Sequence, residues 1–353
     1  MKKTLFIMAA VAAMACSCDK DADCEPCQEA QTKATLNVSL DFENEPQTRA
    51  TSYVTAQTYE TKVNDVQVLV FDSTGALNAY VDADTKTSGI SISTTAGSKT
   101  VWAVVNGPNL SSITTLSALQ STAVDLGANS TTETTGFVMA GSTTCTVGSS
   151  AATASIAVKR LVARVALQKI NNSLPASYGA LTVNNVTLIN VVGNQNLAGS
   201  ASISTWYNKM GRKKDATATG QIIDGSTYVA EIPTLTFKSV GTSVANGGSL
   251  APTTPYLFYT YPNPTTSDVT GWSSSTTFTA RKTRLVVAAT IGGTKYYYPV
   301  VIDAPVRNTA YTVELTITGL GSTDPDKPVE KGSITASVTV EGWASGAVYN
   351  ETI

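Results

Sequence analysis

The chain has 353 residues, a formal net charge of -2 and no histidine. This charge balance provides no basic surface for nucleic acid, and the lack of histidine excludes Ser-His-Asp catalysis and histidine metal sites. Charged residues make up only 14% of a composition rich in Ser, Thr, Val, Ala and Gly, which is typical of β-rich extracellular proteins. We therefore expect no enzymatic activity, no metal and no cofactor.

Residues 1–18, MKKTLFIMAAVAAMACSC, have the layout of an export signal. Two lysines precede an apolar run that is too short to span a bilayer permanently. Small residues then lead into cysteine, which resembles a bacterial lipoprotein signal whose cysteine is acylated after cleavage. Because a polar Asp-Lys-Asp stretch follows Cys18, we expect a signal peptide over 1–17 and lipidation of Cys18. The alternatives are lipidation of Cys16 and an ordinary cleaved signal peptide.

A polar tether, residues 19–33, precedes the first strand. It contains Cys24 and Cys27, a single Cys-x-x-Cys pair without a second pair or a histidine, which is weak evidence for zinc. Four apolar residues then alternate strictly with polar ones, so this stretch predicts a strand with one buried face: Leu36, Val38, Leu40 and Phe42. An acidic turn and a lone Arg49 follow directly.

Short apolar runs recur between residues 63 and 170, separated by Gly, Asn, Ser and Thr, as in an antiparallel sandwich. They are VNDVQVLVF (63–71), TVWAVVNG (100–107), TGFVMAG (135–141) and TASIAVKRLVARVALQKI (153–170). Lys159, Arg160 and Arg164 lie in the last run, and we expect them to make interdomain surface contacts. Residues 110–126, with spaced leucines, are the only plausible helix in this half.

A second set of strand-like runs begins near Tyr178. Its members are 180–192, STYVAEIP (226–233), YLFYTYP (256–262), 283–291, TKYYYPVVI (294–302) and 310–320. The Gly-Gly pair inside Ile-Gly-Gly-Thr, residues 291–294, suits a tight two-residue hairpin turn. The sequence thus predicts an all-β fold of two antiparallel β-sandwich domains in tandem, over 50–168 and 169–331.

The end of the chain repeats the pattern of its beginning. A linker rich in Pro and Asp, residues 319–333, is followed by four apolar residues at two-residue spacing: Ile334, Ala336, Val338 and Val340. Two predicted strands with nearly the same binary pattern therefore lie at opposite ends of the chain.

Loss of the first strand would expose an apolar groove between two unpaired strand edges. Its four apolar side chains contribute roughly 6–12 kcal/mol if each is worth ~1.5–3 kcal/mol, which is an upper bound because the unfolded chain already buries part of this surface. A donor strand from another molecule could recover these contacts by β-augmentation. While the first strand stays attached, it competes at an effective concentration on the order of mM. Cleavage at Arg49 would remove this competitor.

Several motifs together resemble the fimbrillin family of Bacteroidales type V pili. They are the lipoprotein leader, the strand before Gln-Thr-Arg-Ala, VKRLVARVAL (158–167), FYTYPNP (258–264), and the closing order of 310–321, linker and ASVTVEGW (336–343). The resemblance runs over most of the chain, and the order of the motifs is more specific than any one of them.

The resemblance implies two transthyretin-like β-sandwich domains and export through the periplasm to the outer membrane as a lipoprotein precursor. It implies that an arginine-specific, gingipain-like protease cuts between Arg49 and Ala50, which removes the propeptide 18–49 with the displaced strand, residues 34–43. The donor segment would be 332–353, in which Trp343 departs from the alternation and predicts a bulge.

By the same resemblance, the chain would be a stalk subunit that polymerises with itself into a cell-surface fimbria supporting adhesion. Its further partners would be minor pilus subunits, an outer-membrane anchor subunit, and host or bacterial surface receptors.

The rival hypothesis is a glycan-binding surface lipoprotein that does not polymerise. YLFYTYP and KYYYPVV supply aromatic rings that could stack on sugars, although tyrosines also fill half-buried faces of strands. The densest basic stretch, GRKKD (211–215), is interpreted as a solvated loop.

Overall fold

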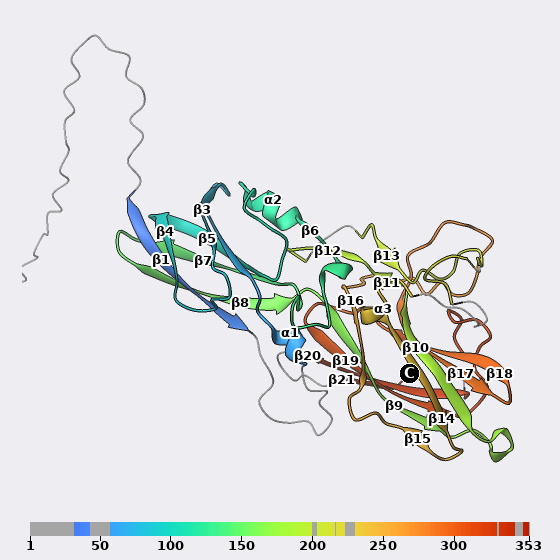
Figure 1. Cartoon of the computed structure of the whole chain (residues 1–353). Coiled ribbons are helices and arrows are strands. Elements are labelled where there is room, and N and C mark those ends of the chain that lie inside the picture. The colour runs from blue at the N-terminus through green and yellow to red at the C-terminus, as the bar shows by residue number, and fades with distance from the viewer. Residues whose placement is uncertain are drawn as a thin grey trace, which may run out of the picture.

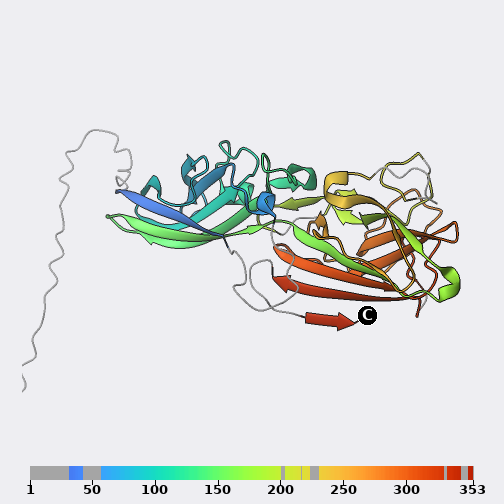
Figure 2. The same cartoon turned by 60° about the horizontal axis from the view of Figure 1, so that its bottom comes forward.

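A computed structural model describes residues 32–42, 57–199, 203–215, 217–222, 230–329, 332–342 and 349–352. The described chain forms two β-rich lobes that lie end to end (Figures 1 and 2). Helices are few and short, so the predicted all-β class is confirmed.

The first lobe is built on seven hydrogen-bonded strands in the order β3-β2-β5-β7-β8-β1-β4. Neighbouring strands are antiparallel except β1 and β8, which run parallel. The strands are β1 (Lys33–Phe42), β2 (Val66–Phe71), β3 (Leu77–Asp82), β4 (Ile90–Thr95), β5 (Gly97–Val105), β7 (Met139–Val147) and β8 (Ala152–Arg160).

Strand β2 has apolar side chains on both of its faces, because each face packs in a different apolar core. Val66, Val68 and Val70 of β2 pack in a core that includes β1 and β4, whereas Leu69 and Phe71 pack in a second core on the other face. Helix α2 (Leu116–Ser121) lies over that second face and buries Leu119; it is the only α-helical part of the predicted 110–126 helix.

Two large sheets form most of the described second lobe, beside the small pair β11-β13. One has the order β14-β10-β17-β18, and the other has β15-β9-β19-β20-β21 with β16 also paired to β9. The strands are β9 (Ala163–Asn172), β10 (Leu181–Ile189), β14 (Phe237–Val244), β15 (Ser249–Leu250), β16 (Tyr256–Thr260), β17 (Thr283–Ile291), β18 (Thr294–Ile302), β19 (Thr309–Ile317), β20 (Ile334–Gly342) and β21 (Tyr349–Thr352).

Short elements complete the chain and join the lobes. Strand β12 (Asn194–Asn196) from the second lobe pairs with β6 (Ala123–Asp125) from the first. The others are α1 (Thr58–Thr61), η1 (Leu126–Ala128), η2 (Ala176–Tyr178), β11 (Val191–Val192), β13 (Trp206–Tyr207) and α3 (Pro233–Thr236). The largest core cluster includes Phe137 and Leu161 together with Phe258 and Leu285, so the lobes share a continuous apolar interior.

The change from one lobe to the other falls at Leu161 and Val162, between β8 and β9. The boundary expected at 168/169 therefore passes through β9, a strand that belongs wholly to the second lobe. The sequence gives no break here because both residues at the junction are fully buried, which makes the apolar run continuous across it.

Two local predictions have different outcomes. The Gly-Gly hairpin is confirmed, since Gly292 and Gly293 join β17 to β18 with φ of +56° and +82°, as a type I′ turn requires.

The prediction of a strand at 226–233 is wrong for the described residues of this range, because Ile232 takes a left-handed conformation and Pro233 begins the helix α3.

A test of the first lobe's packing is Gly141→Ala. A Cβ at this position in β7 would collide with the carbonyl oxygen of Ala157 on β8, whereas a Cβ on Gly148 would meet nothing within 4 Å. We expect Gly141→Ala to destabilise the protein by about 1–3 kcal/mol and Gly148→Ala to have little effect, as measured by urea unfolding. Equal unfolding midpoints for the two variants would contradict the close approach of β7 and β8.

Candidate functional site

Strand β1 lies inside the sheet of the first lobe. It pairs antiparallel with β4 from Lys33↔Thr95 to Val38↔Ile90, and parallel with β8 from Leu36↔Ala152 to Phe42↔Val158. Leu36 and Val38 are 0% and 1% exposed. The predicted strand with one buried face is therefore confirmed as a structural element.

The slot that β1 fills is lined by apolar side chains from both neighbours. They are Ile90 and Ile92 from β4, and Ala154, Ile156 and Val158 from β8, all buried in one core cluster with Leu36 and Val38. Without β1, the floor of this slot would face solvent between two strand edges with unpaired backbone groups.

The free energy gained by burying β1 in this slot comes mainly from two of its four apolar side chains. Leu40 and Phe42 lie at its rim and are only partly buried. The two fully buried side chains account for about 3–6 kcal/mol, at ~1.5–3 kcal/mol each. This value lies below the upper bound of roughly 6–12 kcal/mol taken from the sequence, because Leu40 and Phe42 are only partly buried.

Strand β20 lies next to β19 in the second lobe, near the end of its sheet. It pairs antiparallel with β19 over its whole length, from Ile317↔Ile334 to Thr309↔Gly342, and β21 pairs with its other edge. Ala336 and Val338 are buried at 5% and 6% exposure, and Ile334 and Val340 are partly buried against the core. The C-terminal strand thus packs on its own chain here.

The two terminal strands lie in different lobes, as the blue β1 and the red β20 show (Figures 1 and 2). The expected signal peptide, Cys16, Cys18, the cleavage pair Arg49 and Ala50, and Trp343 all lie outside the described residues.

The segment after the expected cleavage site is anchored between the lobes by Glu60 of α1. The carboxylate of this fully buried residue lies 2.9 Å from Arg164 on β9 and accepts hydrogen bonds from the Gln57 N–H at 2.8 Å and the Tyr259 hydroxyl at 2.5 Å. Burial, and then the negative charge of Glu60, raises the pKa of Tyr259 well above its ordinary value. The tyrosine therefore stays protonated as a hydrogen-bond donor.

The basic residues of the 158–167 motif contribute to this interface. Arg160 donates from Nε to the carbonyl oxygen of Glu60 at 2.7 Å, and Arg164 makes the ion pair. The predicted interdomain contacts of these two residues are confirmed, but both side chains are buried and not at the surface. Sequence reasoning missed Glu60, although its place three residues after Gln57 is a capping-box spacing.

The aromatic runs contain six tyrosines, of which Tyr256 and Tyr296 are partly buried. Four of their tyrosines are at most 1% exposed and fill the core: Tyr259, Tyr261, Tyr297 and Tyr298. The 211–215 stretch behaves as predicted, because Lys213, Lys214 and Asp215 are exposed.

Within the described residues, no helix is long and apolar enough to cross a membrane. No set of three or more His, Cys, Asp or Glu residues is placed to hold a metal ion in the same part of the chain.

Residues 34–202 match the family of the major fimbrial subunit protein FimA. No curated protein sequence matches the chain. The predicted resemblance to fimbrillins is confirmed by the family match and by the fold shared with solved structures.

Three solved structures illustrate the shared fold. A candidate cell adhesion protein from Bacteroides eggerthii is 18% identical with a TM-score of 0.60, over 89% of this chain and 96% of that one. The fimbrilin FimA from Porphyromonas gingivalis is 13% identical with a TM-score of 0.60, over 90% and 99%. The tip fimbrial protein Mfa3 from the same organism, with a C-terminal truncation, is 14% identical with a TM-score of 0.50, over 87% and 99%.

The slot of β1 can be tested with Leu36→Ala and the matched control Asn37→Ala. Leu36 is fully buried and Asn37 is its exposed neighbour on the same strand. We expect a loss of about 2–5 kcal/mol in the free energy of unfolding for Leu36→Ala, and a change within about 0.5 kcal/mol for Asn37→Ala. Denaturant unfolding measures both, and similar small losses would show that β1 is not part of the core.

The interface anchor can be tested with Glu60→Gln. This change removes the carboxylate from a buried arginine, so we expect destabilisation of about 3–5 kcal/mol. Glu133→Gln is the control, because Glu133 is exposed and its carboxylate accepts a hydrogen bond from the Thr58 hydroxyl. A thermal or urea melt in which both variants behave alike would rule out the anchor.

Proposed function

We propose, on the premise that residues 34–202 match the major fimbrial subunit family and that the chain has the fold of solved fimbrillins, that this protein is a structural subunit of a cell-surface fimbria. The family match and the fold support a role in pili and adhesion. A non-enzymatic role agrees with both.

The proposed mechanism of assembly is strand exchange. An arginine-specific protease cuts between Arg49 and Ala50, which severs the covalent link between β1 and the rest of the first lobe. Strand β1 then leaves with the propeptide 18–49, and the C-terminal segment 332–353 of another copy enters the slot between β4 and β8. The single observation that supports this most strongly is the internal position of β1.

Once the link is cut, β1 loses the high effective concentration that kept it in the slot, and the donor strand can compete for the same place. In its own lobe β20 has one neighbour in the body of the sheet, β19, because its other neighbour β21 belongs to the same tail. In the slot, an incoming strand has two such neighbours, and each backbone hydrogen bond contributes roughly 0.5–1.5 kcal/mol net. The donor strand β20 therefore leaves one neighbouring strand, β19, and gains two neighbouring strands, β4 and β8 of the accepting copy.

The binary pattern of the donor suits the slot. Ile334, Ala336, Val338 and Val340 present apolar side chains at the same spacing as Leu36, Val38, Leu40 and Phe42. Either strand can thus place one apolar face on the slot floor while its polar face remains in water.

The wider assembly follows from the family resemblance. The precursor travels through the periplasm to the outer membrane as a lipoprotein acylated at Cys18 or Cys16. The processed subunit joins a homopolymeric stalk, with minor subunits and an outer-membrane anchor as partners, and the fimbria supports adhesion to host or bacterial surface receptors.

The glycan-binding alternative loses its main support, because the tyrosines proposed to stack on sugars are largely buried. Glycan affinity of an uncut monomer that never polymerises would revive it.

The assembly prediction separates the donor from the acceptor. Purified precursor treated with an arginine-specific protease should begin at Ala50 and form filaments, visible by electron microscopy and as ladders on gels. Arg49→Gln should stay monomeric because its slot remains filled. A variant ending at Val329 should be cut but remain monomeric because it has no donor strand.

A mixing experiment provides the control for folding. The cut variant ending at Val329 can only accept a strand, and uncut Arg49→Gln can only donate one. Together they should form heterodimers and nothing longer, measured by light scattering. Filaments built by the tail-deleted variant alone would overturn strand donation.

A further inference from the structure

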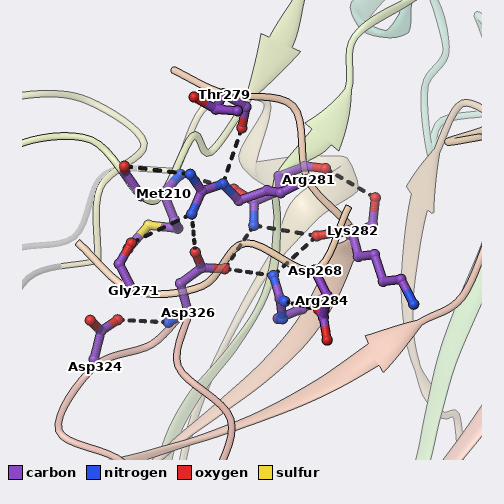
Figure 3. A network of polar contacts seen from close by, with 12 residues as sticks. Met210, Asp268, Gly271, Thr279, Arg281, Lys282, Arg284, Asp324 and Asp326 are labelled. Carbon is purple, nitrogen blue, oxygen red and sulfur yellow. Dashed lines mark hydrogen bonds and ion pairs between the residues drawn. The ribbon is translucent and has the colours of Figure 1, made fainter. Parts of the chain in front are cut away.

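The segment between β19 and β20, predicted as a linker, is held by a buried carboxylate. Asp326 is fully buried in the middle of this segment. Its two carboxylate oxygens lie 2.7 Å from Arg281 and 2.8 Å from Arg284, and the side-chain amide of Asn190 donates a third bond at 2.9 Å. Figure 3 shows the two guanidinium groups converging on this one aspartate.

The partners of Asp326 come from the sheet that β20 does not join. Arg284 lies on β17, Arg281 lies two residues before that strand begins, and Asn190 directly follows β10. Both β10 and β17 are central strands of the sheet β14-β10-β17-β18, whereas β20 belongs to the other sheet. The carboxylate therefore fastens the segment independently of β20.

Further contacts hold the segment upstream of Asp326. Ser322 and Tyr297 on β18 exchange backbone hydrogen bonds of 2.8 and 2.9 Å, and the Tyr298 hydroxyl donates to the Gly319 carbonyl at 3.0 Å. Asp324 accepts from the Asp326 N–H at 2.9 Å. Immediately downstream, Lys327 and Pro328 are exposed.

The charges make this attachment costly to open. Burial raises the pKa of Asp326, while Arg284 and Arg281 oppose that shift. Release of the segment would separate a buried carboxylate from two buried guanidinium groups, and an uncompensated buried charge is strongly unfavourable. Arg284 is also paired with the exposed Asp268 at 2.7 Å, which fixes its orientation.

We propose that Asp326 is the fixed end of the donated tail. It holds the preceding segment on the sheet of β10 and β17 while everything beyond it can leave β19 and enter another copy. This inference rests on the proposed strand donation. It adds that the part of the second lobe that stays in place during donation ends at Asp326. Asp326 acts as a positioning residue for assembly.

If Asp326 stays in place, the chain between it and β20 limits the distance over which the donor strand can extend to another copy. Eight residue steps separate Asp326 from Ile334 (334 − 326), and an extended chain spans at most ~3.3–3.6 Å per residue, or about 26–29 Å in total. The slot of the accepting copy must therefore begin within this distance of the donor's Asp326.

The test is hydrogen exchange, followed by mass spectrometry, on the uncut full chain. In the unmodified protein, amides of 320–326 should exchange at least roughly tenfold more slowly than those of 334–340, because the tail opens without the anchored segment. Asp326→Asn should remove that difference, with both segments exchanging alike. Asp268→Asn is the matched control, since it removes an exposed partner of Arg284 and leaves Asp326 in place.

The outcomes distinguish anchoring from general stability. Exchange of 320–326 together with 334–340 in the unmodified protein would overturn the proposal, and this measurement needs no variant to fold. An unchanged difference in Asp326→Asn would also overturn it. A uniform acceleration over β10 and β17 in that variant would show a role in global stability only, and would likewise count against it.

The same proteins, cut by the protease, provide the readout of function. Asp326→Asn should form filaments in reduced yield, and Asp268→Asn should match the unmodified subunit. If the unmodified subunit forms no filaments after cleavage, the strand-donation proposal fails even where the exchange difference is found. If it forms filaments but the exchange difference is missing, only the role of Asp326 fails.

Discussion

The insertion of β1 between β8 and β4 is the constraint on which the rest depends. A strand near the N-terminus usually adds to the edge of a sheet, where its loss exposes one new edge. Here it completes the core of Leu36, Val38, Ile92 and Ile156, and β4 has β1 as its sheet neighbour. The first lobe is therefore complete only while this strand, or one like it, fills the slot.

Buried ion pairs lie next to each of the two terminal segments. Glu60 pairs with Arg164 shortly after the region that carries Arg49, and Asp326 pairs with Arg281 and Arg284 shortly before β20. Such pairs add little net stability compared with apolar packing, but they resist local opening because each partner would be left buried and charged. Each ion pair therefore lies at the point where a terminal segment meets the rest of its lobe.

The continuous apolar interior across the two lobes has a mechanical consequence. Since β9 follows β8 after two buried residues and β12 pairs with β6, the lobes are joined by packing as well as by the chain. A pull transmitted from a tail in one lobe to a slot in the other would pass through this core. Such a path suits a subunit of a fibre.

The alternation of Leu36 to Phe42 and of Ile334 to Val340 was sufficient to predict two amphipathic strands, because the side-chain period of a strand is a local property of the backbone. Composition likewise determined the all-β class, and the Gly-Gly pair determined one hairpin. Only the tertiary structure decided that β1 is internal, that Leu40 and Phe42 are partly buried, and that four tyrosines of the aromatic runs lie in the core. It also decided that Glu60 and Asp326 pair with arginines 104 and 42 residues away in sequence. Burial and charge pairing depend on which segments meet in space, and a linear pattern does not contain that information.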